Sequence, residues 1–397
     1  MSQVRSVLDT IGRTPLVALR WLGAGLPVPV LVKCEQLNPG GSVKDRIARA
    51  IVEDAEARGL LAPGATLIEA TAGNTGIGLA LVAAARGYSL VCVMPEKMSV
   101  DKRIALTTLG AQVIITPNAA PTHPDNFRNV ARRLAETNGW FLTDQFRNPA
   151  NVRVHAETTG VEILEQAGGR VGAFVAGAGT GGTISGVGRY LKAQLPRVQI
   201  VLADPVGSSL ADWVETGKLG PDGSYAVEGI GGSEVPDNLH RAVIDRAERV
   251  TDEESFATAL RLIREEGLLV GGYAGTNVAA ALRIAARGDV DAPWSRCCPT
   301  RGIATGQSRG CEPTDRRLEA RRCRITACSP SPRSRSRLTP RSHGCGKLCS
   351  TSRTTRRGTH SSSVPRATGR SQWAQCCACR SAGANAAAPV PTRSSPS

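Results

Sequence analysis

One lysine in this sequence follows a turn of small residues and stands where a helix is expected to begin. Lys44 lies within Asn38-Pro-Gly-Gly-Ser-Val-Lys44-Asp-Arg46, at the start of an amphipathic stretch. A lysine there feels the positive end of the helix dipole, and partial burial would further disfavour its charge. Both effects favour the neutral amine that a Schiff base requires. Taken alone, such a stretch more often marks an ordinary exposed lysine.

A second segment is suited to binding an anion. Gly177-Ala-Gly-Thr-Gly-Gly-Thr183 follows an expected strand and precedes an expected helix. Successive backbone N–H groups at a helix N-terminus form an anion cradle, and two threonine hydroxyls add donors. The segment lacks the Gly-Lys-Ser/Thr of a P-loop and fits the dinucleotide fingerprint poorly. A small phosphate monoester is the better match, and a merely flexible loop is the alternative.

A third segment, Thr71-Ala-Gly-Asn-Thr-Gly76, repeats the order of strand, turn and helix. Its hydroxyl and N–H groups at a helix N-terminus suit a carboxylate or a phenolate oxygen. By itself it could equally be a cluster that caps the helix.

The elements that must position these segments alternate along the chain. Short buried strands are predicted at Val30–Glu35, Ala65–Glu69, Ser89–Met94, Gln112–Ile115, Ala173–Ala176 and Val198–Ala203. Helices are predicted at Ser42–Arg58, Thr75–Arg86, Val100–Leu109, Asn151–Gln166 and Gly182–Leu195. This alternation is typical of βαβ units and a mainly parallel sheet.

Composition divides the chain near residue 294. Residues 295–397 contain 20 Lys and Arg, 19 of them Arg, against three acids, and they hold ten of the 12 cysteines. The first 294 residues carry 29 basic and 31 acidic groups, so the net charge of +15 comes from the tail. No stretch has the length of a membrane span, and the N-terminus does not resemble a signal peptide. These features predict a cytoplasmic protein without a membrane partner.

Together and in this order, the three segments resemble the fold-type-II pyridoxal-phosphate enzymes of the cysteine synthase and cystathionine β-synthase family. The resemblance covers about residues 7–288. It includes further matching stretches, namely Thr14-Pro-Leu16, Pro95-Glu-Lys-Met-Ser99, Asp144-Gln-Phe-Arg-Asn-Pro-Ala-Asn151, His155-Ala-Glu-Thr-Thr159, Glu228-Gly-Ile-Gly231 and Glu266-Gly-Leu-Leu-Val-Gly-Gly272.

The resemblance implies an α/β fold of two three-layer αβα domains with mainly parallel sheets, similar to the tryptophan synthase β-subunit. A smaller domain of residues 41–146 and a larger one of residues 1–40 and 147–294 are expected. Residues 295–397 are left as a low-complexity tail. A homodimer that acts on small amino acids is also implied.

The family's functional residues carry over to matching positions. Lys44 would form the Schiff base with pyridoxal 5'-phosphate, and Asn74 would hold the cofactor's phenolate oxygen. The phosphate would be bound by Gly179, Thr180, Gly181, Gly182 and Thr183. The substrate's α-carboxylate would be held by the loop of Thr71, Ala72, Gly73 and Thr75 and by Gln145. No metal is expected.

The implied reaction is β-replacement on serine or an activated serine, in which Lys44 removes the α-proton and a thiol or sulfide then adds. Details of the second, fifth and sixth matching stretches favour cystathionine β-synthase, which joins L-serine and L-homocysteine. The alternative is an O-acetylserine sulfhydrylase, that is, a cysteine synthase. An alternative of another class is a catalytically impaired scaffold protein with the same fold.

Two departures from the family pattern favour that last alternative. Ala72 replaces a serine of the carboxylate loop, and the loss of one charge-assisted hydrogen bond would cost on the order of 1.5–3 kcal/mol. Tyr273 replaces the serine that binds the cofactor's pyridine nitrogen. A phenol can make the same hydrogen bond but is far bulkier, so it must reorient or crowd the ring.

The tail carries no convincing site of its own. Its arginines could suggest nucleic-acid binding, but Trp373 is its one aromatic residue and offers no stacking platform. Its cysteines could suggest zinc, yet no Cys-x₂-Cys pair recurs at finger spacing. Nucleic acid and metal are therefore not expected as partners.

A frameshift near residues 292–296 explains the tail better. The family continues with a segment like Leu-Leu-Pro-Asp-Ser-(Gly/Trp)-x-Arg-Tyr. The codons permitted from the third base of Arg296 onward can encode that segment in another reading frame. We therefore predict that sequencing the coding DNA across codons 285–310 will recover it out of frame. A clean gene without the segment in any frame would contradict the hypothesis.

Overall fold

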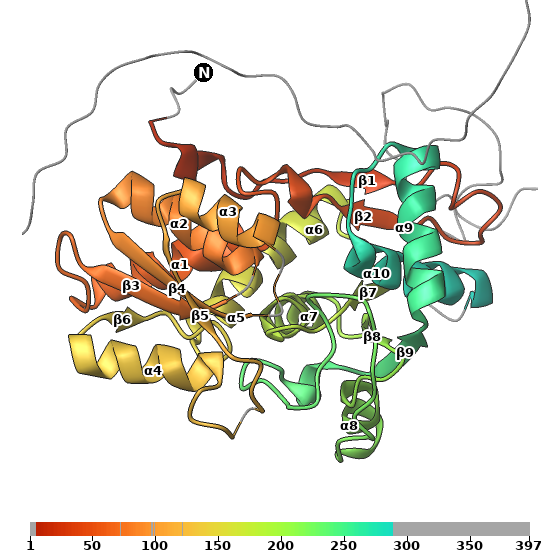
Figure 1. Cartoon of the computed structure of the whole chain (residues 1–397). Helices are drawn as coiled ribbons and strands as arrows, with labels where there is room; N and C mark the ends of the chain where they lie inside the picture. The colour runs from red at the N-terminus through yellow and green to blue at the C-terminus, as the bar shows by residue number, and fades with distance from the viewer. Residues whose placement is uncertain (1–4, 72, 97, 99, 121, 289–397) are drawn as a thin grey trace, which may run out of the picture. The chain divides into compact units, whose positions relative to one another are not determined.

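The protein is described from a computed structural model that covers residues 5–71, 73–96, 98, 100–120 and 122–288 (Figure 1). Within these residues, a four-stranded sheet has the order β5-β4-β3-β6. Its strands are β3 (Thr66–Ala70), β4 (Ser89–Pro95), β5 (Gln112–Thr116) and β6 (Phe141–Leu142), and all neighbours run parallel.

Helices cover both faces of this sheet. Helices α1 (Lys44–Ala57), α2 (Asn74–Arg86) and α3 (Val100–Thr108) lie on one face, and α4 (Phe127–Asn138) lies on the other (Figure 1). Adjacent strand residues point to opposite faces, so Leu67 packs in the cluster with α1 and α2 while Ile68 packs in the cluster with α4. A parallel sheet buried on both sides explains the nearly continuous apolar strands.

The second sheet has the order β7-β8-β9 and is also parallel. It consists of β7 (Ala173–Ala176), β8 (Gln199–Pro205) and β9 (Arg246–Val250). Helices α7 (Gly182–Gln194) and α8 (Leu210–Thr216) contribute to the apolar cluster on one face, and α10 (Gly272–Arg287), which packs against α9 (Asp252–Glu266), contributes to the other.

The remaining elements pack around these two layered units. Strands β1 (Leu16–Ala18) and β2 (Leu31–Lys33) form an antiparallel pair. Helix α5 (Ala150–Val154), the π-helical turn η3 (His155–Thr159) and α6 (Gly160–Gln166) follow one another and pack against α7. In the part of the chain that the structure describes, no helix combines the length and apolarity that a membrane crossing requires.

The predicted fold class is confirmed, since each of the two parallel sheets lies between helical layers. All six predicted strands are present within two residues of their predicted ends. The predicted helix over residues 151–166 is interrupted by η3, so it is a mixed α and π segment rather than one α-helix. The domain boundaries stay predictions. The tail of residues 295–397 and its frameshift lie outside the described residues.

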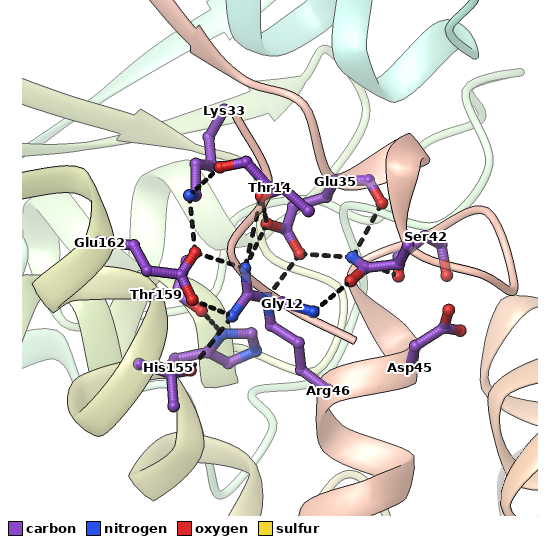
Figure 2. A network of polar contacts seen from close by, with 12 residues as sticks. Gly12, Thr14, Lys33, Glu35, Ser42, Asp45, Arg46, His155, Thr159 and Glu162 are labelled. Atoms are coloured by element: carbon purple, nitrogen blue, oxygen red, sulfur yellow. Dashed lines mark hydrogen bonds and ion pairs between the residues drawn. The ribbon is translucent and has the colours of Figure 1, made fainter. Parts of the chain in front are cut away.

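A buried ion cluster ties the N-terminal segment to α1 and α6 (Figure 2). Arg46 is 3% exposed and donates to both carboxylate oxygens of Glu35, at 2.7 and 2.9 Å, and to both of Glu162, at 2.8 Å each. Thr158 accepts the remaining N–H, and Lys33 donates to Glu162 at 2.7 Å. We call these five residues the Arg46 cluster.

The cluster determines the charge state of its members. Burial would raise the pKa of Glu162, but the hydrogen bonds from Arg46 and Lys33 outweigh it and lower that pKa to about 2. Burial likewise opposes the charge on Arg46, and the bonds to Glu162 and Glu35 nevertheless raise its pKa. Arg46, Glu35 and Glu162 are therefore ionised at neutral pH.

We expect Arg46→Met to lower the free energy of unfolding by about 3–5 kcal/mol at pH 7, because Glu35 and Glu162 lose their guanidinium partner. The pKa of Glu162 is lower in the folded protein, so its contribution is present above about pH 4.5 and is lost as the pH falls toward 2. The difference between variant and wild type should therefore shrink at pH 3. Urea unfolding at both pH values measures it.

The control is Arg261→Met, which removes an exposed pair with Glu265 one helical turn away. Its expected cost is below about 0.5 kcal/mol. Equal losses in the two variants would contradict the role of the Arg46 cluster.

Candidate active site

A cleft of about 1470 Å³ lies where the loops after β3 and β7 face each other. Parallel α/β sheets place their ligand sites at the carboxyl ends of the strands, and this cleft follows that rule. The predicted site residues that line it are Lys44, Thr71, Gly73, Asn74, Thr75, Gln145, Gly179, Thr180, Gly181, Thr183 and Tyr273. Gly182 lies behind the lining, against Asn151, and Ala72 lies outside the described residues.

The turn before α1 presents Lys44 to the cleft. Asn38 donates to the carbonyl groups of Glu35 and Ser42, at 2.9 and 3.1 Å, and Asp45 accepts from the N–H of Gly40 at 2.5 Å. Among the described residues, none accepts a hydrogen bond from the Lys44 ammonium group. Burial lowers the pKa of Lys44, which increases the fraction of neutral amine.

The loop after β3 places polar groups opposite the loop after β6. Thr71 directly follows the strand, and α2 begins at Asn74, whose exposed side chain lines the cleft. The Thr75 hydroxyl donates to Oε1 of Gln145 at 2.6 Å, and both side chains are buried. These contacts bring the predicted carboxylate-binding residues together, while their role as ligands stays a prediction.

The loop after β7 requires glycine at three positions, namely 179, 181 and 182. A Cβ on Gly179 would lie 2.3 Å from the carbonyl oxygen of Gly229, and one on Gly182 would lie 1.9 Å from Oδ1 of Asn151. Gly181 has a φ of +82°, which disfavours any side chain. The backbone therefore lies tightly against its neighbours with the N-terminus of α7 directed at the cleft.

Two buried side chains orient the threonine hydroxyls of this loop. Asn151 donates to Oγ1 of Thr180 at 3.0 Å, which leaves the Thr180 proton free for an anion. His155 contacts Oγ1 of Thr183 at 3.2 Å and Oγ1 of Thr159 at 2.9 Å. Burial lowers the pKa of His155 to about 3, so the ring is neutral. With its proton on Nε2, it donates to Thr183 and leaves that hydroxyl proton free as well.

Tyr273 is the second residue of α10 and lies beside Gly229 and Gly271 in the cleft wall. Burial raises the pKa of its phenol, with a smaller contribution from the charge of Glu35. The hydroxyl is therefore protonated at neutral pH and can serve as a hydrogen-bond donor or acceptor.

Three residues that the structure places behind the site had no role predicted from the sequence. Asn151 and His155 contact the threonine hydroxyls that are predicted to bind phosphate, and Glu69 contacts Gln145. Asn151 and His155 lie in stretches that carry the family resemblance, and this position could have marked them as candidate site residues. Glu69 lies in an otherwise apolar strand, and an acid at such a position could have indicated a functional residue.

These observations define a class of protein. The glycine loop, its free hydroxyl protons and the start of α7 fit a phosphate group, because each supplies a hydrogen-bond donor at a positive helix end. A partly desolvated lysine without a hydrogen-bond partner among the described residues faces the same cleft. The site thus belongs to a lysine-dependent α/β enzyme that holds a phosphorylated cofactor.

Comparison with known proteins agrees with this class. The chain is 48% identical over 283 residues to a cystathionine beta-synthase of Apis mellifera, covering 70% of this chain and 56% of that protein. It is 45% identical over 288 residues to cysteine synthase 1 of Emericella nidulans, covering 71% and 78%. The chain therefore spans about half the length of the cystathionine beta-synthases that it matches.

A crystal structure of O-ureido-L-serine synthase superimposes with a TM-score of 0.66 at 43% identity, covering 72% of this chain and 87% of that chain. The family model described as pyridoxal-phosphate dependent enzyme matches residues 7–297. The chain belongs to this family, and pyridoxal 5'-phosphate is its cofactor.

Tyr273 provides a test of cofactor binding. We expect Tyr273→Ser to bind pyridoxal 5'-phosphate about fivefold more tightly, because a small hydroxyl removes the crowding and keeps one hydrogen bond. Equilibrium dialysis of the cofactor measures the change without relying on activity. Tyr273→Phe, which keeps the bulk and removes the hydroxyl, is the matched control and should not gain affinity. Unchanged occupancy and activity in Tyr273→Ser would show that the prediction is wrong.

Proposed function

We propose that this chain catalyses β-replacement on serine or an activated serine, most like cystathionine β-synthase with L-serine and L-homocysteine. The observation that carries the proposal is the meeting of Lys44, the Thr75–Gln145 pair and the glycine loop in one cleft. The similarity to cystathionine beta-synthases over most of the described residues supports it.

The chain's own residues divide the work. Gly179, Thr180 and Thr183 would hold the cofactor phosphate, and the Asn74 amide would donate to its phenolate oxygen. Thr71, Thr75 and Gln145 would hold the substrate's α-carboxylate. Pyridoxal 5'-phosphate, when bound, supplies the electron sink for the substrate's α-carbon.

Lys44 is the proton carrier of the proposed reaction. Its lowered pKa allows Nζ to accept the α-proton, while the bond from Cβ to the leaving oxygen breaks. The thiol sulfur of the second substrate then bonds to Cβ, and the proton returns to Cα. Serine would release its hydroxyl group as water by taking up the thiol proton, and O-acetylserine would release acetate while the thiol proton passes to solvent.

An O-acetylserine sulfhydrylase is the second candidate. It is favoured by the similarity to cysteine synthase 1, because the chain covers a larger share of that protein than of the cystathionine beta-synthases. A catalytically impaired scaffold protein is the third, and Tyr273 in the cleft wall favours it.

Visible absorption of the protein loaded with cofactor separates these candidates. We expect the cofactor band to shift on addition of L-serine, and borohydride reduction to fix the cofactor on Lys44 as detected by mass spectrometry. A shift with O-acetylserine alone would favour the sulfhydrylase. Lys102→Ala, which changes another lysine of the cleft wall, should leave the label in place. Absence of the band and of the label on Lys44 would favour the scaffold protein.

We also propose that the protein works as a homodimer in the cytoplasm and acts on small amino acids. The two cysteines within the described residues, Cys34 and Cys92, are both free thiols, which is in keeping with a reducing compartment. The dimer is proposed from the family resemblance.

A further inference from the structure

Glu69 is a buried acid at the edge of the cleft. It stands in β3, two residues before Thr71, and is 1% exposed. Its hydrogen-bond partners within the described residues are Thr143 and Gln145, and neither carries a charge. An ionised carboxylate without a cation is an expensive group to bury, so a purely structural role is better served by a neutral side chain.

The contacts of Glu69 converge on one residue. Its Oε2 accepts from the backbone N–H of Gln145 at 3.2 Å, and its Oε1 accepts from the side-chain Nε2 of Gln145 at 3.3 Å. The Thr143 hydroxyl donates to Oε2 as well. Gln145 is therefore held by both its backbone and its side chain.

This arrangement determines which way the Gln145 amide faces. Nε2 is directed at Glu69, and Oε1 is directed at Thr75, which donates to it at 2.6 Å. An amide nitrogen carries two hydrogens, so one remains available after the bond to Glu69. A neutral amide in place of Glu69 would bring its own donors and would allow the Gln145 amide to turn over.

We propose that Glu69 is a positioning residue for substrate binding, which holds the Gln145 amide so that its second N–H is presented to the substrate's α-carboxylate. The inference rests on the proposed function, because it concerns the carboxylate site of an amino-acid substrate. Burial raises the pKa of Glu69 to about 7, which agrees with a group retained at a cost in stability.

The test compares Glu69→Gln with wild type in the full chain loaded with pyridoxal 5'-phosphate. Dissociation constants for L-serine and O-acetyl-L-serine are measured by the change in visible absorption, and melting temperatures are measured in parallel. We expect at least tenfold weaker binding of the amino acid, because a hydrogen bond to a charged group is lost or misdirected. The melting temperature should be unchanged or higher, and cofactor affinity should be unchanged.

Asp204 provides the matched control. It is also fully buried at the end of a strand, and burial raises its pKa to about 6. One of its oxygens accepts from the N–H of Ala211 at 2.8 Å, and the residue does not line the cleft. Asp204→Asn should therefore change the melting temperature and leave the affinity for amino acids within twofold of wild type.

A double-mutant cycle identifies the path of the effect. If Glu69 acts through Gln145, adding Glu69→Gln to Gln145→Ala should weaken binding less than twofold further. A full tenfold loss on that background, or wild-type affinity in Glu69→Gln alone, would overturn the proposal. Wild-type protein that binds neither amino acid would overturn the proposed function, and with it this inference.

Discussion

The site depends on the hydrogen bonds that the guanidinium group of Arg46 makes with Glu35 and Glu162. The five guanidinium N–H groups are used by Glu35 near the N-terminus and by Thr158 and Glu162, which lie one helical turn apart more than 100 residues later. Arg46 follows Lys44 by two residues, and successive helical residues are about 100° apart. The two side chains therefore leave α1 in nearly opposite directions. By anchoring Arg46, the cluster sets the rotation of α1 that directs Lys44 at the cleft.

Neutral partners behind the cleft complete this arrangement. Asn151 contacts the hydroxyl of Thr180, His155 contacts that of Thr183, and Gln145 contacts that of Thr75. Each of these threonines lines the cleft. The Thr180 hydroxyl consequently keeps its proton for an anion, as the Gln145 amide keeps one N–H, and the Thr183 hydroxyl does the same when the His155 proton is on Nε2. The ionised Arg46 cluster thus fixes the position of α1. The neutral hydrogen-bonded pairs beside the cleft instead fix the direction in which hydrogen bonds are donated.

Tight backbone packing is the second requirement of the site. The glycine loop lies against Gly229, Leu239 and Asn151 so closely that a methyl group would collide with each of them. Both sheets end their strands at the same cleft, so the glycine loop after β7 faces Lys44 and the loop after β3. A chain with the same motifs but without this packing would still contain the required residues, but they would not meet in one cleft.

The parallel α/β class, six of the strands and the segments around Lys44, Thr71 and Gly177 could be predicted from the residues alone, because hydrophobic periodicity and turn-forming residues act over short stretches of chain. The helices α4, α8, α9 and α10 were not predicted, and the charged outer faces of α4 and α9 dilute the apolar pattern of those two. The π-helical turn that carries His155 was not predicted either. The contact of Glu69 with Gln145, and the bridge from Glu35 through Arg46 to Glu162, arise only when the chain folds. Those partners are 76 residues apart in the first pair and up to 116 in the second, and such distances are closed by packing rather than by any local pattern.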